Sequence, residues 1–172
     1  MFDTFKQDVA RWIIPGSVSD VAQVNLRVTL KLLFRHMSLR AMLWFRLASW
    51  CKQNHVPYLP SAIQRGLLKN YGLEVMSGAE IGGGLYIAHP VGTVIMVNRM
   101  GQNCSVIASV TIGMRNEWKF PVIGDEVFIG AGARVLGAID VGARARIGAN
   151  AVVINDVPAN ATVVGIPAKV IA

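Results

Sequence analysis

The chain has 172 residues, 53% of them hydrophobic, and a formal net charge of +7 at pH 7. This length suits one domain with its own core, or one domain with a helical appendage. No stretch of about 18 uncharged apolar residues occurs, which excludes an ordinary membrane-spanning helix. The charged residues Asp3, Lys6 and Asp8 near the start do not fit a secretory signal, so we expect a cytoplasmic protein.

Residues 1–71 show the spacing of helices. Apolar residues in Phe5–Ile14 recur at helical intervals, and a Pro-Gly pair follows that segment. A second run, Leu26–Trp50, contains neither Pro nor Gly, and Ile63–Asn70 predicts a short last helix. We therefore predict an N-terminal helical segment over residues 1–71.

The excess positive charge is confined to this helical segment. No Asp or Glu occurs between Val21 and Leu73, whereas eight Lys and Arg residues do. Interleaved with Leu, Phe and Trp, this run suits an interfacial helix at the inner face of a membrane, or at an anionic lipid carrier. The alternative is that the helix packs as a cap on the rest of the chain. Nucleic-acid binding is the generic interpretation of a basic segment, but the apolar content suits packing better, and we expect no nucleic-acid partner.

A different period begins in residues 72–172. Six aliphatic residues recur at intervals of six, and the residue four positions after each is small or aliphatic: Ile123, Ile129, Val135, Val141, Ile147 and Val153. Upstream, the same interval links Val75, Ile81 and Ile87 and, after a one-residue shift, Val94, Met100, Val106 and Ile112. Neither an α-helix nor an ordinary strand has a period of six.

This period predicts a mainly β fold, a left-handed parallel β-helix built from hexapeptide repeats. Each hexad forms one flat face, three hexads close a turn, and stacked turns pair as parallel strands. The aliphatic residue points inward, and the Gly that often follows it relieves the bend. Residues 114–122 fit no hexad and are expected to form a loop, the kind of element that often carries function.

Four segments of this second part resemble a known family. They are GLYIAHPVG at residues 84–92, SVTIG at 109–113, and the later IGDEVFIGAGARVLG and VVGIPAKVI. They are similar to the serine acetyltransferase branch of the hexapeptide acyltransferases, and closer still to relatives of that branch in exopolysaccharide and capsule synthesis. The resemblance covers about residues 72–172. It implies an O-acetyltransferase that uses acetyl-CoA as co-substrate, needs no metal and forms a homotrimer.

The resemblance also implies a catalytic pair. His89 matches the general base, which removes the hydroxyl proton as the oxygen attacks a thioester, an effect typically of about 10²–10⁴-fold. Glu74, fifteen residues earlier, matches the acid that orients the imidazole and stabilises its protonated form. The family usually has Asp there, so Glu74 adds one methylene group.

Acetyl-CoA, by the same resemblance, lies in a groove between adjacent subunits. The matching positions are Gly130, Ala131, Arg146, Ala149 and Lys169. Small side chains leave room for the pantetheine arm, and Arg or Lys can meet the nucleotide phosphates. Backbone amides at Gly113 and Met114 are expected to supply the oxyanion donors.

The chain departs from the serine enzymes at two places. Those enzymes carry Arg-His-Pro just after the loop and Asp directly before the base, where this chain has Lys119-Phe120-Pro121 and Ala88. The missing groups are those that a zwitterionic amino acid needs. Trp118 and Phe120 offer apolar faces of the kind that stack on sugar rings, with Lys119 beside them. We therefore expect the acceptor to be a sugar hydroxyl, in a surface polysaccharide or a lipid-linked oligosaccharide precursor.

Other functions remain open at this point. Serine O-acetylation for cysteine biosynthesis is the main alternative, and N-acetylation of an amino sugar is a third. A non-catalytic scaffold subunit is disfavoured by His89 in an intact motif. A carbonic anhydrase of the same fold needs three His on zinc, whereas His36 and His55 fall in the helical segment.

Overall fold

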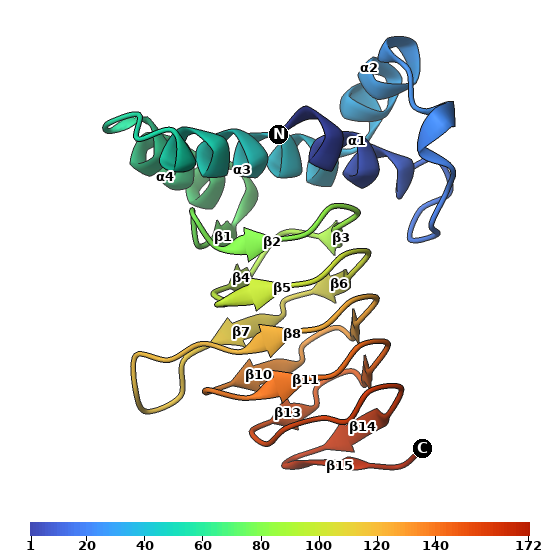
Figure 1. The fold of residues 1–172 in the computed structure, drawn as a ribbon, viewed down its shortest axis with the longest axis vertical. Helices are drawn as coiled ribbons and strands as arrows, with labels where there is room; N and C mark the ends of the chain where they lie inside the picture. Colours follow the sequence, from blue (N-terminus) through green and yellow to red (C-terminus); the bar gives the residue numbers. More distant parts are fainter.

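The structure, a computed structural model, describes residues 1–172. Its helices form a layer across one end of a stack of β-coils, and the C-terminus lies at the other end (Figure 1). The helices are α1 (Phe2–Ala10), α2 (Leu26–Arg35), α3 (Met37–Gln53) and α4 (Leu59–Tyr71), with a short 3-10 turn, η1 (Val21–Gln23). We call these elements, together with the segments that connect them, the helical cap. None of the helices combines the length and apolar character that a membrane crossing requires.

The expected single helix over Leu26–Trp50 is two helices. His36 has an extended backbone, with φ −116° and ψ 111°, and separates α2 from α3. Its ring packs on Trp12, with 4.6 Å between the ring centroids. No Pro or Gly is present at this point of the sequence. The break coincides instead with the tertiary contact between His36 and Trp12. Helix α4 begins earlier than expected because Pro60 lies in its first turn, where the missing N–H has no helical partner to lose.

Fifteen strands form three sheets, and the chain visits the sheets in rotation. The first sheet contains β1 (Leu73–Val75), β4 (Thr93–Ile95), β7 (Thr111–Gly113), β10 (Arg134–Leu136) and β13 (Val152–Val153). The second contains β2 (Glu80–Ile81), β5 (Arg99–Met100), β8 (Val122–Ile123) and β11 (Asp140–Val141). The third contains β3 (Tyr86–His89), β6 (Ser105–Ala108), β9 (Phe128–Ile129), β12 (Arg146–Ile147), β14 (Thr162–Gly165) and β15 (Ala168–Val170).

Pairing between these strands is parallel except between β14 and β15, which form an antiparallel hairpin at the end of the chain. The fold is a left-handed parallel β-helix of about five turns with N-terminal helices. The predicted fold class is confirmed.

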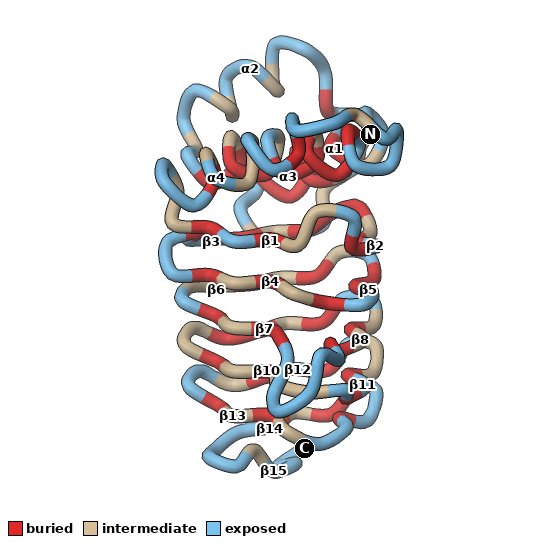
Figure 2. The backbone as a smooth tube through the Cα atoms, turned by 90° about the vertical axis from the view of Figure 1, so that its left-hand side faces the viewer, coloured by how far each residue is buried: buried red, intermediate tan, exposed pale blue.

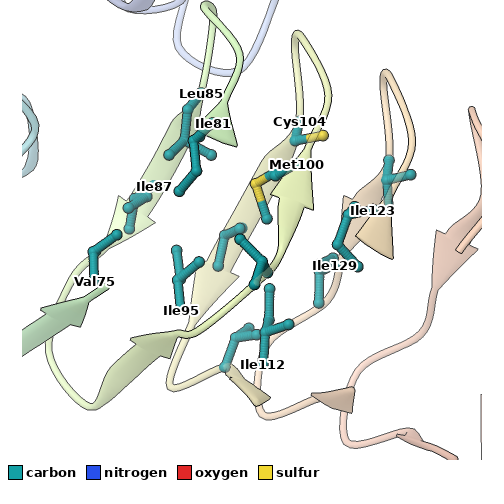
Figure 3. Packing of buried hydrophobic residues seen from close by; sticks show 14 of the residues in the cluster. Val75, Ile81, Leu85, Ile87, Ile95, Met100, Cys104, Ile112, Ile123 and Ile129 are labelled. Atoms are coloured by element: carbon teal, nitrogen blue, oxygen red, sulfur yellow. The ribbon is translucent and has the colours of Figure 1, made fainter. Parts of the chain in front are cut away.

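The aliphatic anchors form columns inside the coils, and Ile123, Ile129 and Val135 are at most 1% exposed. One anchor was misplaced: Ile95, not Val94, points inward, and it pairs with Val75 and Ile112. Figure 3 shows these three side chains directed into the same interior. The corner between β3 and β4 absorbs two extra residues, and the following face is one residue shorter. An interval of six residues therefore no longer connects one inward-facing residue to the next at this corner.

The glycines after the anchors have a different role from the one expected. A Cβ on Gly124 would lie 2.6 Å from the Ala143 nitrogen, and a Cβ on Gly142 would lie 2.3 Å from the Ala159 nitrogen. Neither glycine has a positive φ. The close approach of successive coils therefore excludes a side chain at these positions. The backbone conformation at the bend is not the reason for glycine here.

A buried ion pair between α1 and α3 holds the helical cap to the first coil through further hydrogen bonds. The Arg46 Nε lies 2.7 Å from Asp8 Oδ2, and both side chains are almost fully buried. Arg46 also donates to the carbonyl oxygens of Ile81 and Gly82, at 2.7 and 2.6 Å. The backbone N–H of Leu85 donates to Asp8 Oδ1 at 2.9 Å. This part of the basic segment is therefore structural, and Arg46 is not available to a membrane.

A second arginine, Arg11, makes a similar connection. Its guanidinium donates to the carbonyl oxygens of Gly84 and Asn103, at 2.8 and 2.7 Å, and to Ser105 Oγ at 2.7 Å. Helix α3 covers the end of the coils, with Leu39, Met42 and other residues fully buried. The cap alternative is thus correct for α3. Figure 2 shows the buried residues of the cap gathered on the side that faces the coils.

Candidate active site

His89 is exposed at the end of β3, where the chain turns a corner into β4. It pairs with Ala108 of the next coil. The carbonyl oxygen of His89 accepts a hydrogen bond from Thr93 Oγ1 at 3.3 Å. The neighbouring Ala88 carbonyl accepts one from Ser38 Oγ at 2.9 Å, which joins α3 to this segment. The backbone that carries the imidazole is thus held by the coil on one side and the helical cap on the other.

Glu74 lies across the same corner. Its strand, β1, pairs with β4, and Glu74 is opposite Val94. The Gly92 N–H donates to the Gly72 carbonyl oxygen at 2.9 Å, which brings the start of β1 against the corner that follows His89. Glu74 is exposed, and no hydrogen bond or ion pair joins it to His89. The orienting role of Glu74 stays a prediction.

A hollow of about 380 Å³ opens beside His89, at the boundary between the coils and the helical cap. The coils contribute Tyr86, Ala88, His89, Pro90 and Val91, and the helical cap contributes Trp12, Pro15, Arg35, His36, Met37 and Ser38. No Asp or Glu lines it. Arg35 is its one permanent positive charge.

Aromatic rings organise the hollow. The Trp12 ring contacts both His36 and Tyr86, with centroid separations of 4.6 and 4.8 Å. Burial lowers the pKa of His36, and the nearby Arg35 lowers it further. His36 is therefore neutral at pH 7, and Arg35 supplies the charge. Burial also raises the pKa of Tyr86, so its hydroxyl keeps its proton.

Sequence reasoning missed Arg35 and His36 as site residues. They lie about fifty positions before His89, in a segment interpreted through its charge as a whole. The one available signal was that this segment contains no acid to neutralise them.

The loop between β7 and β8, residues 114–121, extends away from the coils (Figure 1). Trp118 is 75% exposed and Lys119 forms an exposed ion pair with Glu117 at 2.7 Å. Phe120 is buried, and the Trp118 ring meets it edge to face at 5.2 Å between centroids. The expectation that Phe120 offers a ring face to a substrate is therefore wrong. No loop residue lines the hollow beside His89.

Several of the predicted acetyl-CoA positions stack along the edge that carries His89. Gly130 and Ala131 follow β9 and Ala149 follows β12, at the same corner of the coil where His89 ends β3. A Cβ on Gly130 would lie 2.7 Å from the Ala149 nitrogen, so the coils approach closely here. The edge is thus a narrow strip of small residues that leads away from His89.

Two cations lie on the same sheet as this edge. Arg146 is exposed on β12, with its guanidinium 4.9 Å from the centre of the Phe128 ring. Lys169 is exposed on β15. In contrast, Gly113 ends β7 and Met114 follows it, at a different corner of the three-sided coil. One subunit therefore does not bring these two expected oxyanion donors to His89.

Comparison with known proteins gives a family. Residues 120–155 match the family model described as bacterial transferase hexapeptide (six repeats). The serine acetyltransferase of Helicobacter pylori strain J99 is 38% identical over 145 residues, which cover 82% of this chain and 85% of that protein. The serine acetyltransferase of Synechococcus elongatus is 36% identical over 146 residues. The chain spans 60% of the length of the Synechococcus protein.

Solved structures agree, and the agreement includes the helical cap. Serine acetyltransferase from Neisseria gonorrhoeae in complex with serine matches with a TM-score of 0.82 and 30% identity, over 98% of this chain and 68% of that one. A serine acetyltransferase in complex with CoA matches with a TM-score of 0.82 and 28% identity, with the same coverage of each chain.

These relatives contradict the expectation of a sugar acceptor in polysaccharide synthesis and favour the serine alternative. Ala88 and Phe120 differ from the serine enzymes, but the likeness to them extends along most of the chain. The claim of a closer likeness to polysaccharide O-acetyltransferases has no support either. By sequence and by fold, the chain belongs to the serine acetyltransferase branch of the hexapeptide-repeat acyltransferases.

Proposed function

We propose that the protein is a serine O-acetyltransferase that transfers the acetyl group of acetyl-CoA to the hydroxyl of L-serine. The observation that carries this proposal is the likeness to serine acetyltransferases along nearly the whole chain, with His89 exposed beside a hollow at the corner described above. We further propose that it acts in the cytoplasm as a step of cysteine biosynthesis.

His89 is the general base. Its imidazole removes the serine hydroxyl proton as the oxygen attacks the thioester carbonyl and the new C–O bond forms. The C–S bond then breaks, and the imidazolium returns the proton to the leaving thiolate of CoA. Glu74, across the corner, stabilises the imidazolium and orients its ring. The corner position of His89 supports this role because it leaves the side chain exposed beside the hollow.

Acetyl-CoA lies along the edge below His89. The small residues Gly130, Ala131 and Ala149 allow the pantetheine arm to approach the backbone, and Arg146 or Lys169 meets the phosphates. Gly113 and Met114 end at another edge of the same subunit. A complete site therefore needs a second copy of the chain, and we propose a cyclic homotrimer, in which each subunit has two neighbours.

The hollow beside His89 holds the serine. Its carboxylate pairs with Arg35, which replaces the cations that serine acetyltransferases carry after the loop. The alternative cation, Lys119, is engaged by Glu117 and lies outside the hollow. A charge-assisted hydrogen bond to a planar guanidinium suits a carboxylate, and the absence of acids in the hollow leaves that guanidinium available.

The test is a thiol-release assay with acetyl-CoA, using L-serine, L-alanine and L-serinamide as acceptors. We expect turnover with serine, none with alanine, which has no hydroxyl, and a KM raised by about tenfold or more for serinamide, which has no carboxylate. Mass spectrometry should identify O-acetylserine. Absence of turnover at millimolar serine with the trimeric protein would overturn the proposal, and equal KM values for serine and serinamide would exclude the Arg35 contact.

A further inference from the structure

Helix α2 is exposed in a way that the other helices are not. None of its residues is buried, and it stands apart at the outer end of the molecule (Figures 1 and 2). Leu26, Leu30 and Phe34 are 74%, 58% and 88% exposed. Three large apolar side chains on ten residues are costly to leave in water, so this surface calls for a partner.

The side chains of α2 separate into stripes. Leu26, Leu30 and Phe34 follow one another at intervals of four and share one side of the helix. Arg27 and Lys31, each one residue later, form a parallel stripe about 100° further round. An apolar stripe beside a basic stripe is the pattern of a helix that lies in a membrane interface.

The surrounding charge decides between partners. No Asp or Glu occurs between Val21 and Leu73, so α2, α3 and α4 carry basic side chains and no acidic ones, and the exposed acids near α2 are Asp3 and Asp20 in the preceding segments. A second copy of the stripe would bring like charges together, whereas an anionic surface is complementary. We propose that α2 docks on a membrane surface rich in anionic lipid, with its apolar stripe among the acyl chains and its basic stripe at the phosphates.

The position of α2 permits this contact. The helix lies at the end of the molecule opposite the C-terminus, beyond the layer formed by α3 and α4 (Figure 1). A flat surface beyond this end of the molecule can therefore reach α2 without meeting the coils. The proposal does not depend on acetyl transfer, because Leu26, Leu30 and Phe34 line no part of the hollow beside His89.

Vesicle co-sedimentation of the full chain tests the proposal. At low salt we expect binding to vesicles of phosphatidylcholine mixed with phosphatidylglycerol, and little binding to phosphatidylcholine alone. The variant Arg27→Gln/Lys31→Gln should bind at least about tenfold more weakly, because each basic residue near an anionic surface contributes roughly fivefold. Leu30→Ser/Phe34→Ser should also bind at least about tenfold more weakly while keeping every charge.

The matched control is Arg65→Gln/Lys69→Gln on α4. This pair has the same spacing, the same change in charge and a place in the same helical cap. We expect a loss of less than about threefold. Circular dichroism and thiol release of each variant show that the fold is kept.

Three outcomes would overturn the proposal. The first is no binding of the wild-type protein to anionic vesicles at low salt. The second is equal loss for the α2 and α4 charge variants, which would indicate unspecific attraction. The third is a smaller assembly of Leu30→Ser/Phe34→Ser by light scattering with unchanged vesicle binding, which would assign the stripe to a second copy of the chain.

Discussion

The coils and the helical cap are stabilised in different ways. In the coils one contact repeats: an aliphatic residue such as Ile129 or Val135 packs on its equivalent above and below, fully buried. The helical cap adds contacts that occur only once: the buried Arg46–Asp8 ion pair joins α1 to α3, and both side chains also hydrogen-bond to the first coil. Substituting one member of a repeated contact should lower the stability of the protein only slightly. Removing one partner of a unique buried ion pair should lower it strongly, because the other charge stays buried. The comparison predicts a large difference in sensitivity to substitution.

The two regions also divide the proposed chemistry. The coils carry His89 at an exposed corner, and the helical cap carries Arg35 and His36 above the same hollow. Substitutions in the coils should therefore change the chemical step, and substitutions in the cap should change binding of the acceptor. The following predictions test both contrasts.

His89→Ala should have the largest effect. We expect kcat to fall by at least about 10²-fold because the attacking hydroxyl loses its base, while binding of CoA persists. Glu74→Gln should cost less, since it removes only an orienting and stabilising group. Steady-state kinetics and CoA titration check this, and normal turnover of His89→Ala would show that the base lies elsewhere.

Arg46→Met should destabilise the protein by about 3–5 kcal/mol, because it leaves the Asp8 carboxylate buried without its partner. Ile129→Val, in the middle of a coil column, should cost only about 0.5–1.5 kcal/mol. Chemical denaturation measures both. The double variant Asp8→Leu/Arg46→Met should recover part of the loss. A cost for Arg46→Met no greater than for Ile129→Val would remove the contrast between the two regions.

Gly124→Ala should destabilise the coils by about 1–3 kcal/mol, because the added methyl group meets the backbone of the next coil at 2.6 Å. Gly66→Ala is the matched substitution in the helical cap. Gly66 lies within α4, and the nearest atom to an added Cβ there is Asn70 Nδ2 at 4.0 Å, so alanine should stabilise by about 0.4–1 kcal/mol. A lower melting temperature for Gly124→Ala and a higher one for Gly66→Ala would support the role of Gly124 in the close approach of the coils. An unchanged melting temperature for Gly124→Ala would contradict it.

Arg35→Met should raise the KM for serine by about tenfold, with little change in kcat or in the KM for acetyl-CoA. The reason is that the hollow loses its one permanent cation. Arg35→Lys should restore part of the affinity, since the charge returns without the planar guanidinium. If Arg35→Met and the wild-type protein had the same KM for serine, the helical cap would have no part in binding the carboxylate.

Sequence alone determined the β-helix, because every face of the coil imposes the same requirement: an aliphatic residue inside and a small one near the corner. His89 stood out for a related reason, as the one histidine of the coil region, within a motif that resembles a known family. The period failed only where a corner changed length, at Val94, and such a change leaves no mark in the spacing of neighbouring residues.

Tertiary structure decided what depends on contacts between distant segments. No local pattern connects the residues involved in three such features. They are the break of the helix at His36, the burial of Phe120, and the position of Arg35 and His89 around one hollow. Arg46 and Arg27 belong to the same basic run, yet one is buried against Asp8 and the other is exposed. Charge along a chain shows how many cations a segment has. Only packing shows which of them find a buried partner, because burial of a charge is stable only when that partner is in place.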